Sequence, residues 1–269
     1  MFHSPNSQIC SIRRNLRDYP YTCLSKINKK KVSICIKLPI NFIVFLPLFD
    51  FLMLLWYNFI CDILQKGVKP VMDGKAYYHL PGLFEFFELY RIFLPVFREH
   101  REYFYDWCEI GSIYGAPSDC IWGGGRTSLG EVDPQKVLAL MQEYKISARL
   151  TFSNSLLREE HLQDQKCNAL CALFEENKGV QNGVIIHADL LLDYLQKKYP
   201  GLYLVSSTTK VLTNFREFLE ETDREEFHYI VPDFRLNKKF DQLNQMNTQQ
   251  KEKVEFLCNE CCWFGCKDR

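Results

Sequence analysis

The last twelve residues of the chain hold four of its twelve cysteines. They are Cys258, Cys261, Cys262 and Cys266, and they follow directly on an apolar, strand-like run at 254–257. Thiolates a few positions apart just past a strand end can converge on one soft metal centre, whereas a core needs only isolated thiols. The sequence therefore predicts a thiolate metal site in this tail.

Two kinds of metal centre remain open for these cysteines. Zinc is compatible with the pair Cys258 and Cys261, although no second close pair of His or Cys completes a local finger. An iron-sulfur cluster tolerates a distant ligand, and Cys120, in the loop after the second predicted strand, is the natural candidate. Cys167 and Cys171 lie four apart on a predicted helix and are interpreted as core filler.

Polar side chains follow the predicted strands at the points where these end. In a βα barrel the functional groups lie at that edge, so these residues are candidates for binding a small organic substrate. Catalytic roles are not assigned. Some of the polar residues also have a purely structural interpretation. His79 and His187 can be hydrogen-bonded structural residues. Asp133, Asp189 and Asn214 can be helix caps. The candidate substrate-binding residues are Glu85, Tyr114, Arg126, Asn154, His187, Ser207, Lys210, Asp233, Asn259 and Glu260.

Short apolar, β-branched runs alternate with helical periodicity from residue 77 onward. This alternation is typical of an α/β fold built from βα repeats. A closed TIM barrel has eight strands, so the seven predicted here indicate a TIM-type βα barrel that is open or incomplete. The predicted strands are Ala76–Leu80, Glu109–Tyr114, Ala148–Phe152, Gly183–His187, Leu202–Ser206, His228–Pro232 and Val254–Cys258.

Four helices have identifiable starts or faces. Asp133 caps one, with Val137, Leu138 and Met141 inward. A second helix is expected to begin at Asn214, with Glu217 in capping-box spacing before Phe218 and Leu219. A third is expected over Glu159–Glu175, and the residues on its inward face are Leu162, Ala169, Leu170, Leu173 and Phe174. A fourth is expected to begin at Asn237, with Phe240 and Leu243 inward.

Composition is that of an ordinary globular protein, with 47% apolar and 25% charged residues. The net charge of zero hides an asymmetry, because residues 1–41 carry eight Lys or Arg and one acid, which leaves the remainder at −7. A mildly acidic body without a basic stripe argues against nucleic acid as a partner. The thin spread of the other cysteines favours reduced thiols in a cytoplasmic protein.

The N-terminal segment 1–71 does not share the βα pattern of residues 72–269. Residues 42–60 are apolar but contain Asp50 and Pro47, which makes membrane insertion energetically marginal. Three interpretations remain open for the segment: an extraneous extension before Met72, a membrane anchor through 42–60, or a helix packed on the domain. A protein partner is not identified.

Three motifs in order resemble a known family. Tyr114-Gly is followed by Cys120 and Arg126, then comes Val231-Pro-Asp-Phe-Arg-Leu-Asn237, and last Val254-Glu-Phe-Leu-Cys-Asn-Glu with Cys262, Cys266 and Arg269. Over about residues 76–269 this order resembles the U32 peptidase-like proteins. These have a TIM-barrel-like domain and include oxygen-independent ubiquinone-biosynthesis hydroxylation proteins with a 4Fe-4S cluster.

The resemblance implies a set of cluster ligands. Cys262 and Cys266 match the family's paired ligands and Cys120 the early one, while Cys258 or Cys261 would supply the fourth. A later lysine-isoleucine-glutamate-glycine-arginine segment is absent, as in a chain truncated at its C-terminus, and no proteolytic constellation is evident. The alternative is a non-catalytic binding or scaffold barrel with reduced structural thiols or zinc.

Overall fold

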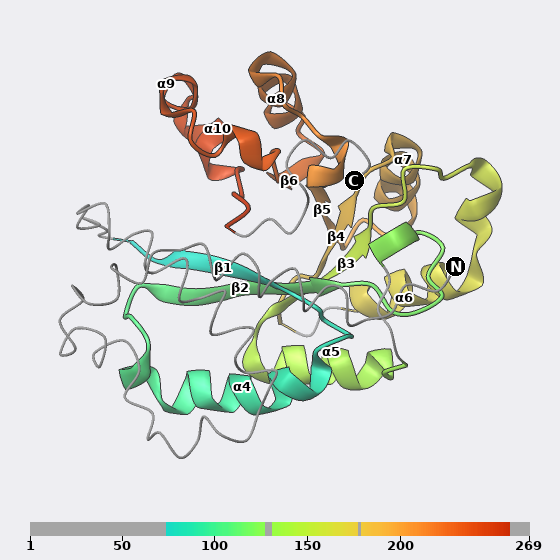
Figure 1. Cartoon of the computed structure of the whole chain (residues 1–269). Coiled ribbons are helices and arrows are strands. Elements are labelled where there is room, and N and C mark those ends of the chain that lie inside the picture. Colours follow the sequence, from blue (N-terminus) through green and yellow to red (C-terminus); the bar gives the residue numbers. More distant parts are fainter. Residues whose placement is uncertain (1–73, 127–130, 177–178, 259–269) are drawn as a thin grey trace, which may run out of the picture.

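Six parallel strands form one curled sheet in the order β1-β2-β3-β4-β5-β6 (Figure 1). The computed structural model describes residues 74–126, 131–176 and 179–258. Every neighbouring pair is parallel, so each connection crosses over one side of the sheet. The strands are β1 (Ala76–Pro81), β2 (Cys108–Gly115), β3 (Ser147–Phe152), β4 (Gly183–Ile186), β5 (Tyr203–Ser206) and β6 (Phe227–Ile230).

Helices surround the outer side of the sheet, which has the form of a half-barrel (Figure 1). Short 3-10 turns lie at Arg101–Tyr103, Gly124–Arg126, Glu159–Gln163, Thr208–Lys210 and Phe234–Leu236. The α-helices are α4 (Phe87–Glu99), α5 (Pro134–Tyr144), α6 (Gln165–Glu175), α7 (Asp189–Lys198), α8 (Phe215–Thr222), α9 (Phe240–Leu243) and α10 (Thr248–Glu252).

The main core fills the space between the outer face of the sheet and the helices. Alternate strand residues such as Leu150, Phe152 and Ile186 are fully buried there. The opposite face carries a second, smaller apolar cluster centred on Ile185 and Val205. Both faces of the central strands are therefore covered, which explains why β4 and most of β5 are apolar.

The first six predicted strands are confirmed, with ends that shift by up to two residues. The seventh is wrong as a full strand. The chain returns to β6 at a single bridge between Ile230 and Val254, and 254–258 has no further ladder among the described residues. The fold is therefore an α/β half-barrel over the part of the chain that the structure describes.

The predicted caps Asp133 and Asn214 are confirmed, because their side chains accept hydrogen bonds from Gln135 N and Arg216 N. The helix predicted over 159–175 is divided: a 3-10 turn ends at Gln163, and the side chain of Asp164 then caps α6. A residue that caps a new helix cannot also continue the preceding one.

Several inward positions were also predicted in these helices. Val137, Leu138, Met141, Leu162, Leu170, Phe174 and Phe218 are buried as predicted, while Leu173, Leu219 and Leu243 are half-buried against the core. The exposure of Ala169 contradicts its predicted place on the inward face of α6, which is taken by Cys167 and Cys171.

The helix expected to open at Asn237 begins later. Lys239 is the N-cap of α9, and Phe240 is 65% exposed and not inward. Asn237 instead closes the 3-10 turn that follows β6, and its amide donates to the carbonyl oxygen of Leu257 at 2.6 Å.

Segment 1–71, with the apolar stretch 42–60, lies outside the described residues. Among the helices that are described, none combines the length and apolarity that a bilayer crossing requires.

Candidate functional site

The inner face of the half-barrel is arranged in rows of side chains from neighbouring strands. Register places Arg149, Gly183 and Tyr203 side by side as a lower row. Two residues further along each strand, a middle row holds Thr151, Ile185, Val205 and Tyr229. Alternation continues past the strand ends, so Ser153, His187, Ser207 and Val231 form an upper row at the carboxyl edge.

The lower row contains a buried ion pair. Arg149 is 2% exposed, and its two terminal nitrogens donate to the two carboxylate oxygens of Glu255 at 2.6 and 2.7 Å. Arg149 Nε donates to the hydroxyl of Tyr203 at 2.7 Å, and the guanidinium carbon lies 5.0 Å from the centre of the Tyr229 ring. All three nitrogens of the guanidinium thus donate a hydrogen bond, as a buried charge requires.

His79 on β1 extends this network. Its Nε2 lies 3.2 Å from Glu255 Oε1, and its Nδ1 lies 2.7 Å from the hydroxyl of Ser112. Burial lowers the pKa of His79 to about 4, with a further lowering by Arg149 and an opposing effect of Glu255. The ring is therefore neutral at pH 7, with Nε2–H donating to the carboxylate and Nδ1 accepting from Ser112.

The upper row carries a relay of hydrogen bonds. Nδ1 of His187 lies 2.9 Å from Thr209 Oγ1, which donates to Ser207 Oγ at 2.9 Å. Ser207 Oγ lies 3.1 Å from Ser153 Oγ. Because the Thr209 proton goes to Ser207, the bond with His187 needs Nδ1–H as its donor.

This proton arrangement leaves Nε2 of His187 as an acceptor. Burial lowers the pKa of His187, and the nearby Lys210 lowers it further against the effect of Asp189. A neutral imidazole in this tautomer can accept a hydrogen bond, or a proton, from a bound molecule. Within the described residues Nε2 of His187 has no hydrogen-bond partner.

Thr151 lies in the middle row, between the ion pair of the lower row and the hydrogen-bond relay of the upper row. It is 7% exposed, and its Oγ1 has no hydrogen-bond partner within the described ranges 74–126, 131–176 and 179–258. A buried hydroxyl without a partner is costly, so such a group on the inner face points to a bound polar molecule or water.

Two of the predicted substrate-binding residues are engaged in ion pairs. Lys210 donates to Glu221 at 2.7 Å and lies 3.4 Å from Asp189. The fully buried Asp233 caps the turn after β6 and accepts from the side chain of Arg235 at 2.6 and 3.0 Å. Both residues stabilise loops at the carboxyl edge through these contacts.

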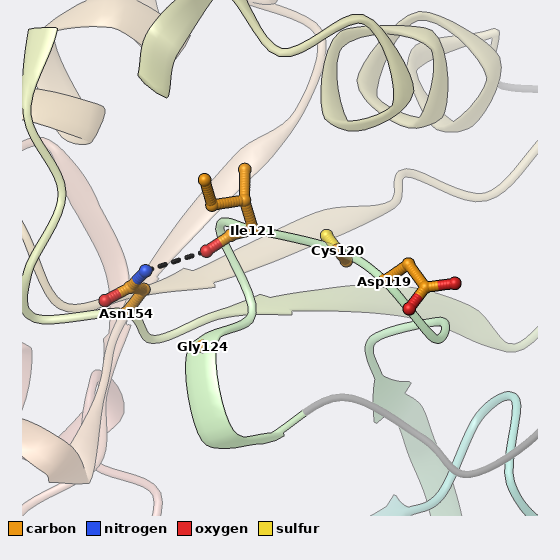
Figure 2. Close-up of a pocket in the computed structure, with 5 residues that line it drawn as sticks. All are labelled: Asp119, Cys120, Ile121, Gly124 and Asn154. Atoms are coloured by element: carbon orange, nitrogen blue, oxygen red, sulfur yellow. Dashed lines mark hydrogen bonds between the residues drawn. The ribbon is translucent and has the colours of Figure 1, made fainter. Parts of the chain in front are cut away.

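Asn154 joins the loops that follow β2 and β3. Its amide donates to the carbonyl oxygen of Ile121 at 2.8 Å, and its Oδ1 accepts from Leu156 N at 2.9 Å. This junction borders a shallow pocket of about 400 Å³. Figure 2 shows the side chains around it. The residues that line it are Asp119, Cys120, Ile121, Gly124 and Asn154.

The remaining predicted residues are dispersed. Tyr114 is half-buried on the inner face, in register with Arg149. Glu85 is exposed in the turn between β1 and α4. Arg126 ends the 3-10 turn after β2, and Asn259 and Glu260 lie outside the described residues.

Cys120 lies in the core beyond the end of β2. Its sulfur is 3.2 Å from that of Cys167 on α6, and Cys171 is buried one turn further along the helix. The bond from Cys167 lowers the pKa of Cys120, as do the backbone N–H groups of Gly123 and Trp122, against the effect of burial. The same bond, together with burial, raises the pKa of Cys167.

The described residues do not bring the predicted metal ligands together. Cys258 is exposed and lies near Tyr78. The pKa of the Tyr78 phenol is raised mainly by burial, then by Cys108, and then by Cys258. Tyr78 pairs with β2 near the start of that strand, whereas Cys120 follows its end. Within the described ranges no group of three or more His, Cys, Asp or Glu could hold a metal ion. Cys261, Cys262 and Cys266 lie outside those ranges.

The residues with the most extensive contacts were missing from the sequence prediction. Arg149 and Glu255 were not selected. Ser153 and Thr209 lie in the polar runs at the predicted strand ends but were not among the candidate substrate-binding residues. An arginine inside an otherwise apolar strand was the available signal, because such a charge is buried only with a partner. No local pattern identifies Glu255 as that partner.

The comparisons with known proteins concern the fold alone. No family model matches the sequence, and no curated protein matches it. Among solved structures the chain is similar to that of the U32 peptidase Mk0906, with 15% sequence identity and a TM-score of 0.43. The similarity covers 70% of this chain and 69% of that chain, and it carries no information about activity.

Proposed function

We propose that the upper row is a binding site for a small polar organic molecule. The observation that carries this proposal is the relay from His187 through Thr209 and Ser207 to Ser153, which gathers the ends of three adjacent strands into one array of hydroxyl and imidazole groups. Ligands of open parallel sheets and barrels bind at this carboxyl edge. The unpartnered Thr151 hydroxyl on the same face adds a second group that requires a polar neighbour.

The charges around the row favour an uncharged ligand, or an uncharged part of one. Lys210 is neutralised by Glu221, Arg235 by Asp233 and Arg149 by Glu255. Hydroxyl and neutral imidazole groups are left for recognition. They match alcohols, amides and carbonyl groups by hydrogen bonding better than they match a carboxylate or phosphate.

Ligand-observed NMR with a panel of uncharged polar and anionic small molecules tests this function. Uncharged members should bind the wild-type chain, and His187→Ala and Ser207→Ala should each weaken binding by about tenfold, the equivalent of one good hydrogen bond. His100→Ala, at an exposed site before β2, is the matched control. Binding that survives both changes, or a panel of which no member binds, would contradict the proposal.

A non-catalytic scaffold barrel, which would bind no small molecule at the upper row, is the competing proposal. The burial of Cys120, Cys167 and Cys171 supports structural thiols, because buried thiols pack as small apolar groups. A ligand panel without hits, together with a stable monodisperse chain, would favour this alternative.

The iron-sulfur cluster, with zinc as its alternative, remains a separate proposal that rests on Cys262 and Cys266. The contact of Cys120 with Cys167 does not favour Cys120 as a ligand, since that thiol would have to leave the core. Iron, acid-labile sulfide and zinc should be measured on the full chain purified without oxygen, with Cys262→Ser and Cys120→Ser as variants. A metal content lost in Cys262→Ser and kept in Cys120→Ser would place the centre in the tail alone.

A further inference from the structure

The strongest feature that the proposed site does not use is the thiol pair of Cys120 and Cys167. The two sulfurs lie 3.2 Å apart on elements separated by 47 residues, the loop after β2 and the first turn of α6. A disulfide requires about 2.05 Å, so the sulfurs need to approach by roughly 1.2 Å, which side-chain rotation and a small loop shift can supply. Neither sulfur has to leave the core for this movement.

The two thiols differ in access. Cys120 lines the shallow pocket with Asp119, Ile121, Gly124 and Asn154 (Figure 2), whereas Cys167 is fully buried and is not one of its lining residues. A molecule as small as hydrogen peroxide fits this space many times over. An oxidant that enters the pocket therefore meets Cys120 first, with the Cys167 sulfur 3.2 Å from that of Cys120.

We propose that Cys120 and Cys167 are a redox-modification site, at which a peroxide oxidises Cys120 and Cys167 resolves the product as a disulfide. The Cys120 thiolate attacks one peroxide oxygen, the O–O bond breaks, and Cys120 sulfenic acid forms with release of hydroxide. The Cys167 sulfur then attacks the sulfenic sulfur, the S–O bond breaks, and the oxygen leaves as water with the thiol proton. In sum, two thiols and one peroxide give one disulfide and two waters.

Cys171 is the competing partner, because it lies one turn from Cys167 and interacts electrostatically with Cys120. The Cys120 sulfur is in contact with that of Cys167, so Cys167 is the expected partner. The inference is independent of the proposed ligand site, although Asn154 borders the pocket and follows Ser153 of the upper row.

Peptide mapping of the full wild-type chain tests the site. The chain is treated with hydrogen peroxide, the remaining thiols are alkylated, and chymotrypsin is used without reductant. Its aromatic and leucine sites separate Cys108, Cys120, Cys167 and Cys171 into the peptides 108–114, 115–122, 163–170 and 171–173. Peptide 115–122 should become linked to 163–170, with loss of the two separately alkylated forms, and dithiothreitol should restore them.

Matched variants complete the test. Cys120→Ser and Cys167→Ser should each abolish this linked peptide, whereas Cys108→Ser and Cys171→Ser should leave it unchanged. The inference is overturned if 115–122 links to 171–173 instead. It is equally overturned if Cys120 stays fully alkylated, or is carried to sulfinic acid without a link, under conditions that oxidise the exposed Cys258.

Discussion

Arg149 on β3 and Glu255, 106 residues later, form two charge-assisted hydrogen bonds of 2.6 and 2.7 Å on the inner face of the half-barrel. The pair fixes the segment after α10 against β3, in the middle of the sheet, and the bridge between Ile230 and Val254 fixes the same segment against β6. It thereby holds the inner face in place where the ladder of strands ends.

Removal of one member of this pair should be strongly destabilising. Glu255→Ala leaves the guanidinium buried without its counter-charge, and we expect a loss of about 3–5 kcal/mol in the free energy of unfolding. Urea denaturation gives the value, with Glu252→Ala, at an exposed position of α10, as the control. In the double variant Arg149→Met/Glu255→Leu much of the loss should be recovered. A loss below about 1 kcal/mol for Glu255→Ala would show that water replaces the pair.

Stability should fall between pH 6.5 and 4 because of His79. The folded-state pKa of about 4 lies below the ordinary value of 6.5, so the unfolded chain binds more protons in this window. The contribution is complete above pH 6.5 and is lost as the pH falls. At pH 5 the expected cost is about 2 kcal/mol relative to pH 7.

Urea unfolding of wild type and His79→Asn at pH 7 and pH 5 isolates this cost, because the variant lacks the titrating group. His100→Asn, which keeps His79, should retain the wild-type pH dependence. An NMR titration that gives His79 a folded-state pKa above 6.5 would show the sign of the effect to be wrong.

Gly183 is required by the ring of Tyr203. A Cβ at position 183 would meet Cε2 of that ring at 2.4 Å, and the ring is held by hydrogen bonds of its hydroxyl to Ser147 and Arg149. Gly183→Ala should cost about 1–3 kcal/mol in unfolding free energy. Gly125→Ala, where a Cβ meets nothing within 4 Å, is the matched control. Equal stability of the two variants would mean that the ring is free to move.

The tautomer of His187 should depend on Thr209. Thr209→Val removes the acceptor of Nδ1–H and the donor to Ser207, so Nε2–H should become the major form, with a loss of about 1–3 kcal/mol in stability. Nitrogen-15 shifts of the imidazole report the tautomer directly. Thr248→Val, at the exposed start of α10, should change neither quantity. An unchanged His187 spectrum in Thr209→Val would refute the relay.

The sequence by itself determined six of the strands and the caps at Asp133 and Asn214. Continuous apolar runs such as 184–186 require burial on both faces of a parallel sheet, and Asp133 and Asn214 act on backbone groups two residues away. These are local effects, so they can be predicted from neighbouring residues alone. The error at Phe240 has the same origin, since helical spacing does not show which face of a short helix meets a core.

Only the tertiary structure decided which polar groups meet. The register of the strands places Ser153, His187 and Ser207 in one row, and the return of the chain to the sheet after α10 brings Glu255 to Arg149. The same packing turns Lys210 towards Glu221 and Cys120 towards Cys167. Such contacts join residues tens of positions apart. They depend on the curl and alignment of the whole sheet, which no local pattern encodes.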